Sequence, residues 1–403
     1  MDLSDVFSAV AYKELVQVDL PGGSHQHELN GSAALRSLFG TQDTVVGRIS
    51  WRYFTDDQGT CRDDDQFKWY DARARGRERT KRSAEWRFYY YGEFLRRARP
   101  GDLLILARPR EQQADLASVY GLVFPAESSV AQQAAALFGL AQESDELTAL
   151  SSGDLATRPL ELFRSGLLTE LDIDVAVPTN PADQELVLDR FGRAFPSTTA
   201  MSELAREASD VSGLDADETL VQWLHREEQL FRSLEEAIES PRIARRFTSI
   251  DEFIEYSKAV ANRRKVRMGR AFENHLGELF RSRGLRFTHN AVTEGSSRPD
   301  FLFPGRQEYH DPSFSENDLL MLGAKSTCKD RWRQVLVEAD RIRVKHLCTL
   351  QTGISPAQTD EMARQRVHLV VPRRYHDTFT AVQQRRLLTL EAFIAEVRAH
   401  QAQ

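Results

Sequence analysis

The stretch LLMLGAKSTCKDRWRQVLVEA, from Leu319 to Ala339, joins an apolar run directly to a dense group of charges. The apolar run is short and unbroken, which is typical of a strand buried on both faces of a sheet. The charges fall within nine residues: Lys325, Lys329, Asp330, Arg331 and Arg333. This stretch therefore predicts a rigid strand that carries a charged segment to the edge of a sheet.

Strand and helix patterns alternate on both sides of this stretch. A helix is expected in the sequence DRWRQVLVEADRIRVK, between the third and fourth strands, and helical patterns dominate residues 201–283. The expected strands are Leu285–Val292, Asp300–Phe303, Leu319–Lys325, His346–Gln351 and Val367–Pro372. Apolar strands separated by helices indicate an α/β domain with a five-stranded mixed sheet.

The first 125 residues have a different pattern, with short β-branched and aromatic runs separated by turn signals such as PGGS and RPGD. The clearest runs are Thr44–Phe54, Trp86–Leu95, Asp102–Arg108 and Ala117–Phe124. Many short strands at this spacing favour a barrel or a sandwich. We expect an N-terminal domain over residues 1–177, a linker over 178–197 and a second domain over 198–403.

The composition is that of an ordinary globular protein, with 41% hydrophobic residues. No apolar run reaches the roughly 20 residues that a membrane helix needs. Three cysteines without a CxxC pair, and an N-terminus without a signal pattern, predict a cytoplasmic protein that does not enter a membrane.

The net charge of −7 argues against a nucleic-acid partner, but the charge distribution does not. Residues 73–82 (RARGRERTKR) and 263–270 (RRKVRMGR) are strongly basic. Their local fields can attract a polyanion, since distant charges are screened beyond about 8 Å at physiological salt. The alternative for each run is an ordinary solvated face.

Asp300, Lys325 and Glu338 are the candidate catalytic residues. Asp300 begins one short strand and Lys325 ends the next, so their side chains can meet, because neighbouring strands lie about 4.8 Å apart. Glu338 lies in the following helix, which can fold back over the pair. Two carboxylates and an ammonium group suit a Mg²⁺ site that supports phosphodiester hydrolysis.

This pattern resembles PD…(D/E)xK, but it departs from it at one position. Gly323 stands where the second acid is usual, so Glu338 must supply that carboxylate. Without further evidence, Asp300 could simply cap a turn and Lys325 could simply end a strand.

Longer motifs decide between these alternatives. KSTCKDRWRQVLVEADRI, NRRKVRMGRAFENHL, TEGSSRPDFLFPG and YHD closely resemble the catalytic domain of the EcoRII restriction endonuclease family, from about Thr248 to the C-terminus. GGSHQ and WYDARARGRERTKR resemble, more weakly, that family's effector domain, a pseudobarrel similar to the plant B-three-type DNA-binding fold.

The resemblance implies a role for each matching residue of the second domain. Asp300 and Glu338 would bind the metal, Lys325 would be the catalytic lysine and Lys329 the second lysine of the active site. Glu273 would lie near the metal or the scissile phosphate, or would form a helix-surface salt bridge. The residues that would read base edges are Asp330, Arg331 and Arg333, which suits arginine's preference for guanine and aspartate's for cytosine.

The resemblance also implies DNA contacts in the N-terminal domain. The residues expected there are His25, Arg73, Arg75, Arg77, Glu78, Arg79, Lys81 and Arg82. In the family this domain binds a second copy of the recognition site and relieves inhibition of the catalytic domain. This chain departs from the family pattern in the N-terminal domain and linker, so the effector mechanism is less directly implied than the chemistry.

The sequence thus predicts a Mg²⁺-dependent type II restriction endonuclease. Its target would be a short CCWGG-like site in double-stranded DNA, cut to give 5′-phosphate ends. A palindromic site favours a homodimer formed through the catalytic domain. The alternatives are a modification-dependent or repair nuclease with the same core, and a DNA-binding regulator with a silent nuclease site.

Overall fold

The computed structural model describes residues 2–21, 27–41, 43–55, 59–74, 83–110, 117–140, 146–157 and 179–402. The chain divides into two compact units. Unit 1 comprises Met1–Val175 and Thr352–Ala357, and unit 2 comprises Ala176–Gln351 and Gln358–Gln403. Unit 1 thus also takes in a short segment from late in the chain.

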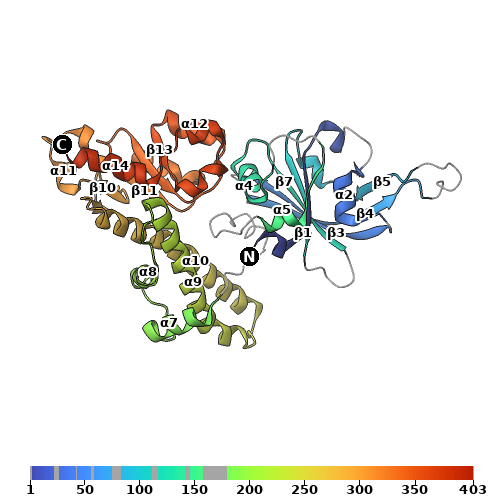
Figure 1. The fold of residues 1–403 in the computed structure, drawn as a ribbon, viewed down its shortest axis with the longest axis horizontal. Coiled ribbons are helices and arrows are strands. Elements are labelled where there is room, and N and C mark those ends of the chain that lie inside the picture. The colour runs from blue at the N-terminus through green and yellow to red at the C-terminus, as the bar shows by residue number, and fades with distance from the viewer. Residues whose placement is uncertain are drawn as a thin grey trace. The chain divides into compact units, whose positions relative to one another are not determined.

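Unit 1 is built on an eight-stranded sheet with the order β2-β5-β4-β3-β7-β6-β1-β8, visible in Figure 1. Strands β3 and β7 run parallel, and the other neighbouring pairs are antiparallel. The strands are β1 (Phe7–Glu14), β2 (Glu28–Asn30), β3 (Val45–Thr55), β4 (Gly59–Asp71), β5 (Trp86–Tyr90), β6 (Leu103–Pro109), β7 (Ala117–Phe124) and β8 (Thr148–Leu150). The expected β-rich architecture is confirmed.

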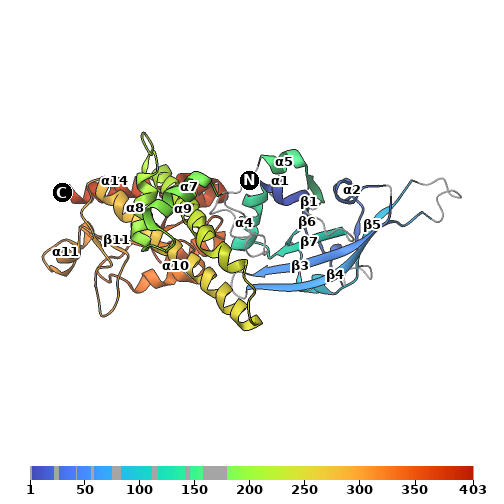
Figure 2. The ribbon, with the colours of Figure 1, turned by 90° about the horizontal axis from the view of Figure 1, so that it is seen from below.

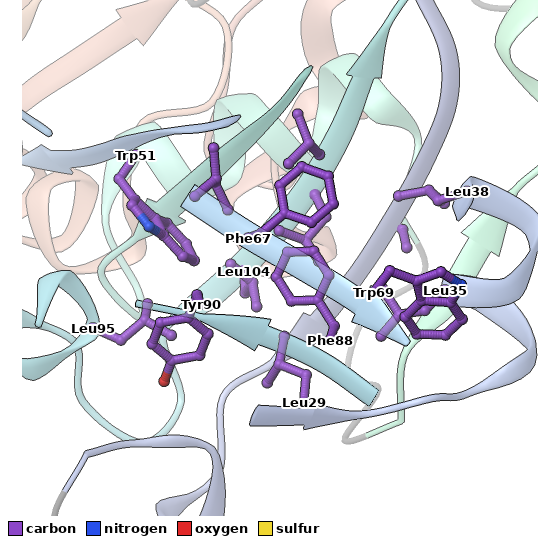
Figure 3. Packing of buried hydrophobic residues seen from close by; sticks show 14 of the residues in the cluster. Leu29, Leu35, Leu38, Trp51, Phe67, Trp69, Phe88, Tyr90, Leu95 and Leu104 are labelled. Carbon is purple, nitrogen blue, oxygen red and sulfur yellow. The ribbon is translucent and has the colours of Figure 1, made fainter. Parts of the chain in front are cut away.

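Both faces of this sheet are covered. Along β6, Leu104 belongs to one hydrophobic cluster and the next residue, Ile105, belongs to another. The first cluster contains Trp51, Phe67 and Phe88 (Figure 3). The rings of Phe67 and Phe88 stack on each other, and Trp51 stacks on Phe94. Short helices border the sheet: α1 (Leu3–Val6), α2 (Ala33–Phe39), α4 (Ser129–Phe138) and α5 (Ser152–Ala156), with the 3₁₀ turns η1 (Gln17–Asp19) and η2 (Phe94–Arg97).

Unit 2 begins with helices. They are α7 (Pro181–Phe191), α8 (Thr198–Glu207), α9 (Ala216–Ile243) and α10 (Ile250–Ser282). Helix α7 occupies the expected linker and packs against α9, with Val187 fully buried. Residues 178–197 therefore contain a packed helix in place of an extended connection. Within the described part of the chain, the helices are all too short or too polar to cross a bilayer.

Helices α9 and α10 form a long hairpin whose turn lies away from the sheet of unit 2, as Figure 1 and Figure 2 both show. Buried ion pairs join the two helices. Arg263, Arg264 and Arg267 of α10 contact Glu239, Glu235 and Glu227 of α9 at 2.7, 2.7 and 3.0 Å. We call this line of pairs, together with His275 at 2.9 Å from Glu227, the α9–α10 seam.

The seam corrects our interpretation of the basic run at residues 263–270. We expected either a DNA-attracting patch or a solvated face. Three of its five cations instead face the acidic residues of α9, and only Lys265 and Arg270 are exposed. The antiparallel packing of two helices brings together partners that are 24 to 40 residues apart in the chain.

The second sheet has five strands in the order β13-β12-β11-β10-β9. Strands β9 (Thr288–His289), β10 (Phe301–Phe303) and β11 (Leu320–Lys325) are antiparallel, whereas β11, β12 (Lys345–Thr349) and β13 (Val367–Val370) are parallel. The expected mixed five-stranded sheet is confirmed.

Aromatic contacts attach this sheet to helices. On one face, Phe280 of α10 contacts Phe301 and Phe303 of β10 with ring centroids 5.1 and 5.4 Å apart. Phe393 of α14 (Leu390–Gln401) packs on His346 of β12 on the same side. The remaining elements are α11 (Arg306–His310), α12 (Pro356–Arg364) and α13 (Ala381–Gln384), with the 3₁₀ segments η3 (Glu316–Asp318), η4 (Lys329–Val337) and η5 (Arg373–Thr378).

Candidate active site

Asp300 and Lys325 meet at one edge of the second sheet, as their positions on neighbouring strands predicted. Asp300 immediately precedes β10, and Lys325 is the last residue of β11. The Lys325 Nζ lies 2.8 Å from Asp300 Oδ2. The same carboxylate oxygen accepts the backbone N–H of Ala324 at 2.6 Å. This second bond fixes the carboxylate relative to the end of β11, so the ion pair is held on two sides.

The structure explains why glycine replaces the usual acid at position 323. Segment η4 crosses β11 at this point, and a Cβ on Gly323 would lie 2.6 Å from Cγ1 of Val335. A carboxylate at position 323 therefore has no room. The segment that excludes it is the one that leads to Glu338, which agrees with the expectation that Glu338 supplies the second carboxylate.

Glu338 is not on an α-helix, and this part of our expectation is wrong. Residues 329–337 form a 3₁₀ segment, and Glu338 follows it in an extended conformation, with Ala339 at φ +52°. The β-branched Val335 and Val337 weaken helix propensity here. Arg331 and Glu338 therefore do not share one face of a regular helix.

The pKa of Glu338 is raised to about 7, mainly by burial and also by the charge of Asp300, against the opposing effects of Lys325 and Lys345. Its Oε2 atom is buried and has no hydrogen-bond donor within the described residues. A buried carboxylate oxygen without a donor is costly unless something else binds it. Among the described residues, this is the one buried side-chain oxygen without a donor in the cluster formed by Asp300, Lys325, Glu338 and Lys345, which we call the active-site cluster.

Lys345, which the sequence did not single out, holds the backbone on which Glu338 sits. Its buried Nζ donates to the carbonyl oxygens of both Glu338 and Ala339, the latter at 2.6 Å. Two other contacts support the same turn: Glu294 accepts the N–H of Asp340 at 3.1 Å, and Tyr309 accepts the N–H of Arg341 at 3.2 Å.

The only sequence signal for Lys345 is a cation at the start of an otherwise apolar strand. The pattern "KHLCT" shows that Lys345 opens a buried run, but it does not reveal the partners of its ammonium group. Burial lowers the pKa of Lys345, while Asp340, Glu294 and Glu338 act in the opposite direction. The ammonium therefore lies among carboxylates that favour its charge.

Glu273 lies on α10 and pairs with His289, with 3.2 Å between the carboxylate and Nε2. In the sheet, His289 pairs with Phe301, which is the residue that follows Asp300 in the chain. The N–H of the next residue, Asn290, donates to the Asp300 carbonyl at 3.0 Å. Glu273 is therefore placed beside the strand pair that carries Asp300, with its carboxylate turned toward a histidine.

The expected base-reading residues lie on η4. Arg331 is exposed, while the intervening Trp332 is fully buried and anchors the segment. Arg333 contacts both carboxylate oxygens of Glu361 on α12 at 3.2 Å. The backbone of Lys329 and Asp330 is part of η4, but their side chains are not among those that the structure describes.

Of the expected N-terminal DNA contacts, only Arg73 lies within the described residues. It forms an ion pair with Glu85, and its N–H donates to Asp71 at 2.9 Å. The other expected residues lie outside the described part of the chain: His25, Arg75, Arg77, Glu78, Arg79, Lys81 and Arg82.

Comparison with known proteins finds a family model that matches part of unit 2. Residues 231–394 match the family model described as EcoRII C terminal. This segment contains the whole of α10, the active-site cluster and η4. The resemblance inferred from the motifs is therefore confirmed for this segment.

A particular relative can also be named. The chain is 45% identical over 204 residues to the type II restriction enzyme EcoRII of Escherichia coli, a match covering 50% of this chain and 50% of the relative. The chain thus aligns with about half the length of that curated relative.

Solved structures of two restriction endonucleases bound to DNA are also similar. Metal-depleted Ecl18kI in complex with uncleaved, modified DNA is 16% identical with a TM-score of 0.44, covering 56% of this chain and 86% of that one. The PspGI–substrate DNA complex is 13% identical with a TM-score of 0.40, covering 56% and 94%.

Proposed function

We propose that this chain is a type II restriction endonuclease that hydrolyses phosphodiester bonds of double-stranded DNA with Mg²⁺. The observation that carries the proposal is the active-site cluster. It combines an Asp300–Lys325 pair 2.8 Å apart with a buried, unsatisfied carboxylate on Glu338. The 45% identity with EcoRII over half of each chain supports the same activity.

The residues present fit a magnesium ion. Mg²⁺ in nucleotide-processing enzymes commonly takes one or two carboxylates and completes its shell with water and substrate phosphate. Asp300 and Glu338 supply two carboxylates, and Glu338 Oε2 has no competing donor among the described residues. In that same part of the chain, no group of three or more His, Cys, Asp or Glu side chains is arranged to hold a metal. DNA and water would therefore supply the other ligands.

The protein side chains divide the work as follows. A bound Mg²⁺ would supply Lewis-acid charge at the scissile phosphate. Lys325 would stabilise the negative charge that develops on the phosphate oxygens and orient the attacking water. Lys345 would keep Glu338 in place through the backbone, and Lys329 and Glu273 would flank the phosphate.

Base recognition is proposed for Asp330, Arg331 and Arg333. They lie on the segment that also leads to Glu338, so reading and cutting would be linked through η4. Arginine binds guanine O6 and N7 bidentately, and aspartate accepts from cytosine N4. A CCWGG-like site would suit these side chains. Arg333 would have to exchange Glu361 for a base edge.

Unit 1 is proposed to be a B-three-like effector domain that binds a second DNA site. Its eight-stranded mixed sheet is compatible with a pseudobarrel, and the strongly basic segment 73–82 follows β4. Phosphate contacts from such a segment would position the duplex, while a few side chains would read bases. A plasmid with one site should then be cut more slowly than one with two, and site-bearing oligonucleotide should speed the slow reaction.

The central experiment is digestion of unmethylated plasmid with Mg²⁺, beside the Lys325→Ala variant. We expect discrete fragments with the intact protein and none with the variant, and sequencing of the ends would define the site. If the intact protein leaves DNA carrying the candidate sites uncut, the enzyme proposal fails. Methylated plasmid in parallel separates a restriction enzyme, which should be blocked, from a modification-dependent nuclease.

The proposed homodimer is tested separately by sedimentation of the full chain with and without a cognate duplex. A two-fold symmetric site predicts two chains on one duplex. A single chain per duplex at saturation would contradict this arrangement.

A further inference from the structure

The turn of the α9–α10 hairpin carries a second concentration of arginines that the proposed chemistry does not use. A hollow of about 440 Å³ lies there, lined by Ile238, Pro241, Arg242, Arg245, Arg246, Phe247 and Glu252. Arg242 belongs to the last turn of α9, and Arg245 and Arg246 lie between the helices. All three arginine side chains are exposed.

These arginines differ from those of the α9–α10 seam a few turns away. In the seam, each guanidinium has a glutamate within about 3 Å. Across the described residues, Arg242, Arg245 and Arg246 form no ion pair within 4 Å. Arg242 instead lies over the ring of Tyr256, 4.7 Å from its centroid. The glutamates of the seam thus already pair with the seam arginines. Among the described residues, the three arginines at the turn have no carboxylate within 4 Å.

The single carboxylate in the hollow is also occupied. Glu252 accepts the N–H and the hydroxyl of Thr248, at 2.7 and 2.6 Å, and these bonds lower its pKa. It therefore stays ionised but faces the start of α10. Three guanidinium groups against one such carboxylate leave the hollow positive, in a chain whose net charge is −7. Guanidinium forks match phosphate oxygens in geometry as well as in charge.

From this arrangement we infer that Arg242, Arg245 and Arg246 form a phosphate-binding site for the DNA backbone outside the recognised sequence. The inference rests on the proposed nuclease function. Helix α10 connects the hollow to the catalytic sheet and so sets the distance between them. At the sheet, α10 lies so close to β10 that a Cβ on Gly277 would be 3.6 Å from the ring of Phe301. At 1.5 Å per residue, the stretch of α10 from Glu252 to Gly277 is about 38 Å long.

This length predicts how far a duplex must extend beyond the site to contact the three arginines. B-form DNA rises 3.4 Å per base pair, so about 38 Å corresponds to about 11 base pairs. A duplex that extends only 5 base pairs beyond the site on each side would not reach the hollow, whereas one with 20-base-pair flanks would. Phosphate contacts are independent of sequence and appear as a steeper dependence of binding on salt.

The test uses the full chain and duplexes of both lengths, carrying the site defined by end sequencing. The variant is Arg245→Gln with Arg246→Gln. The matched control is Arg306→Gln with Arg385→Gln, which removes two equally exposed arginines from other elements of unit 2. We expect the hollow variant to bind the short duplex like the unaltered protein. On the long duplex, the slope of log K against log salt should be less steep for this variant than for the unaltered protein by about two. The control variant should keep the slope of the unaltered protein.

Each other outcome overturns the inference. Equal slopes for the variant and the unaltered protein on the long duplex mean that the arginines are a solvated face. Equal weakening on both duplexes means that they do not act on flanking DNA. If pyrophosphate instead raises the melting temperature of the unaltered protein but not of the variant, without a length effect, the site takes a small phosphate ligand.

A protein partner is the remaining alternative, because Ile243, Ile250 and Phe253 near the turn are exposed. If the variant sediments differently from the unaltered protein without DNA, and duplex length has no effect on the binding of either protein, the surface joins two chains. Failure of the nuclease proposal is recognised independently, because the unaltered protein would then neither cut plasmid nor bind the short duplex.

Discussion

The active-site cluster and the α9–α10 seam are both groups of buried or half-buried charges, yet they differ in how completely the charges are paired. In the seam, arginines of α10 face glutamates of α9, and each of Glu227, Glu235 and Glu239 has an arginine nitrogen within 3.0 Å. In the active-site cluster, the described residues place no cationic nitrogen within 4 Å of the Glu338 carboxylate, and its pKa is raised to about 7. Matched charges hold two helices together, whereas the unmatched carboxylate leaves a coordination position for a ligand.

The largest effect should come from breaking the seam. We expect Arg267→Met to lower the free energy of unfolding by about 3–5 kcal/mol, because the buried Glu227 loses its arginine and the buried Glu228 keeps only Arg232. Chemical denaturation beside the exposed-site control Arg270→Gln would measure it. A loss below 1 kcal/mol would show that the seam contributes little to stability.

The second prediction removes a cation from the active-site cluster and concerns the rate of DNA cleavage. Lys325→Ala should reduce the rate of DNA cleavage by about 10² to 10³-fold, the usual cost of losing one group that stabilises transition-state charge. The melting temperature should also fall, because the buried Asp300 carboxylate loses its cation and keeps the N–H of Ala324. Cleavage is therefore compared at a temperature at which circular dichroism shows both proteins folded, and a folded variant that cuts DNA at the unaltered rate would contradict the role of Lys325.

The unmatched carboxylate also predicts a pH dependence. Below about pH 7 Glu338 carries a proton that Mg²⁺ must displace, so apparent Mg²⁺ affinity should rise about tenfold per pH unit up to pH 7 and then level off. Lys345 lowers the pKa of Glu338, so Lys345→Met should move this inflection to higher pH, while Lys345→Arg should retain it. Calorimetric titration with Mg²⁺ gives the profile, and a flat one would contradict the role of Glu338.

The smallest effect concerns Arg333, whose carboxylate partner is exposed. Arg333→Gln should change the free energy of unfolding by less than about 1 kcal/mol, as is usual for exposed ion pairs. It should weaken binding of the cognate duplex, relative to one with a substituted guanine, by about 1–3 kcal/mol. If Arg333→Gln leaves this preference unchanged, base reading belongs to other residues.

The sequence was most informative where its signals were local. Asp300 precedes one short apolar strand and Lys325 ends the next, and antiparallel pairing brings the start of one strand beside the end of the other. It was least informative where partners are distant. The run at residues 263–270 shows five cations, but nothing in its own pattern reveals that α9 supplies their carboxylates.

The path to Glu338 shows a second limit. Apolar spacing over residues 330–345 fits a helix, but residues 329–337 form a 3₁₀ segment in which Val335 lies against Gly323. Hydrophobic spacing reports burial and does not distinguish an α-helix from a 3₁₀ segment. Lys345 was missed because its function lies in contacts with backbone carbonyl oxygens, which leave no trace in residue type.

The active-site cluster has one further property. All of its members, together with Glu294 and Tyr309 that support it, lie within the segment 294–345. Closing such short loops costs little chain entropy, and local contacts favour rapid folding. The four side chains of the active-site cluster can therefore come together early in folding, and a genetic exchange that transfers this segment would carry all four at once, without Glu273 of α10.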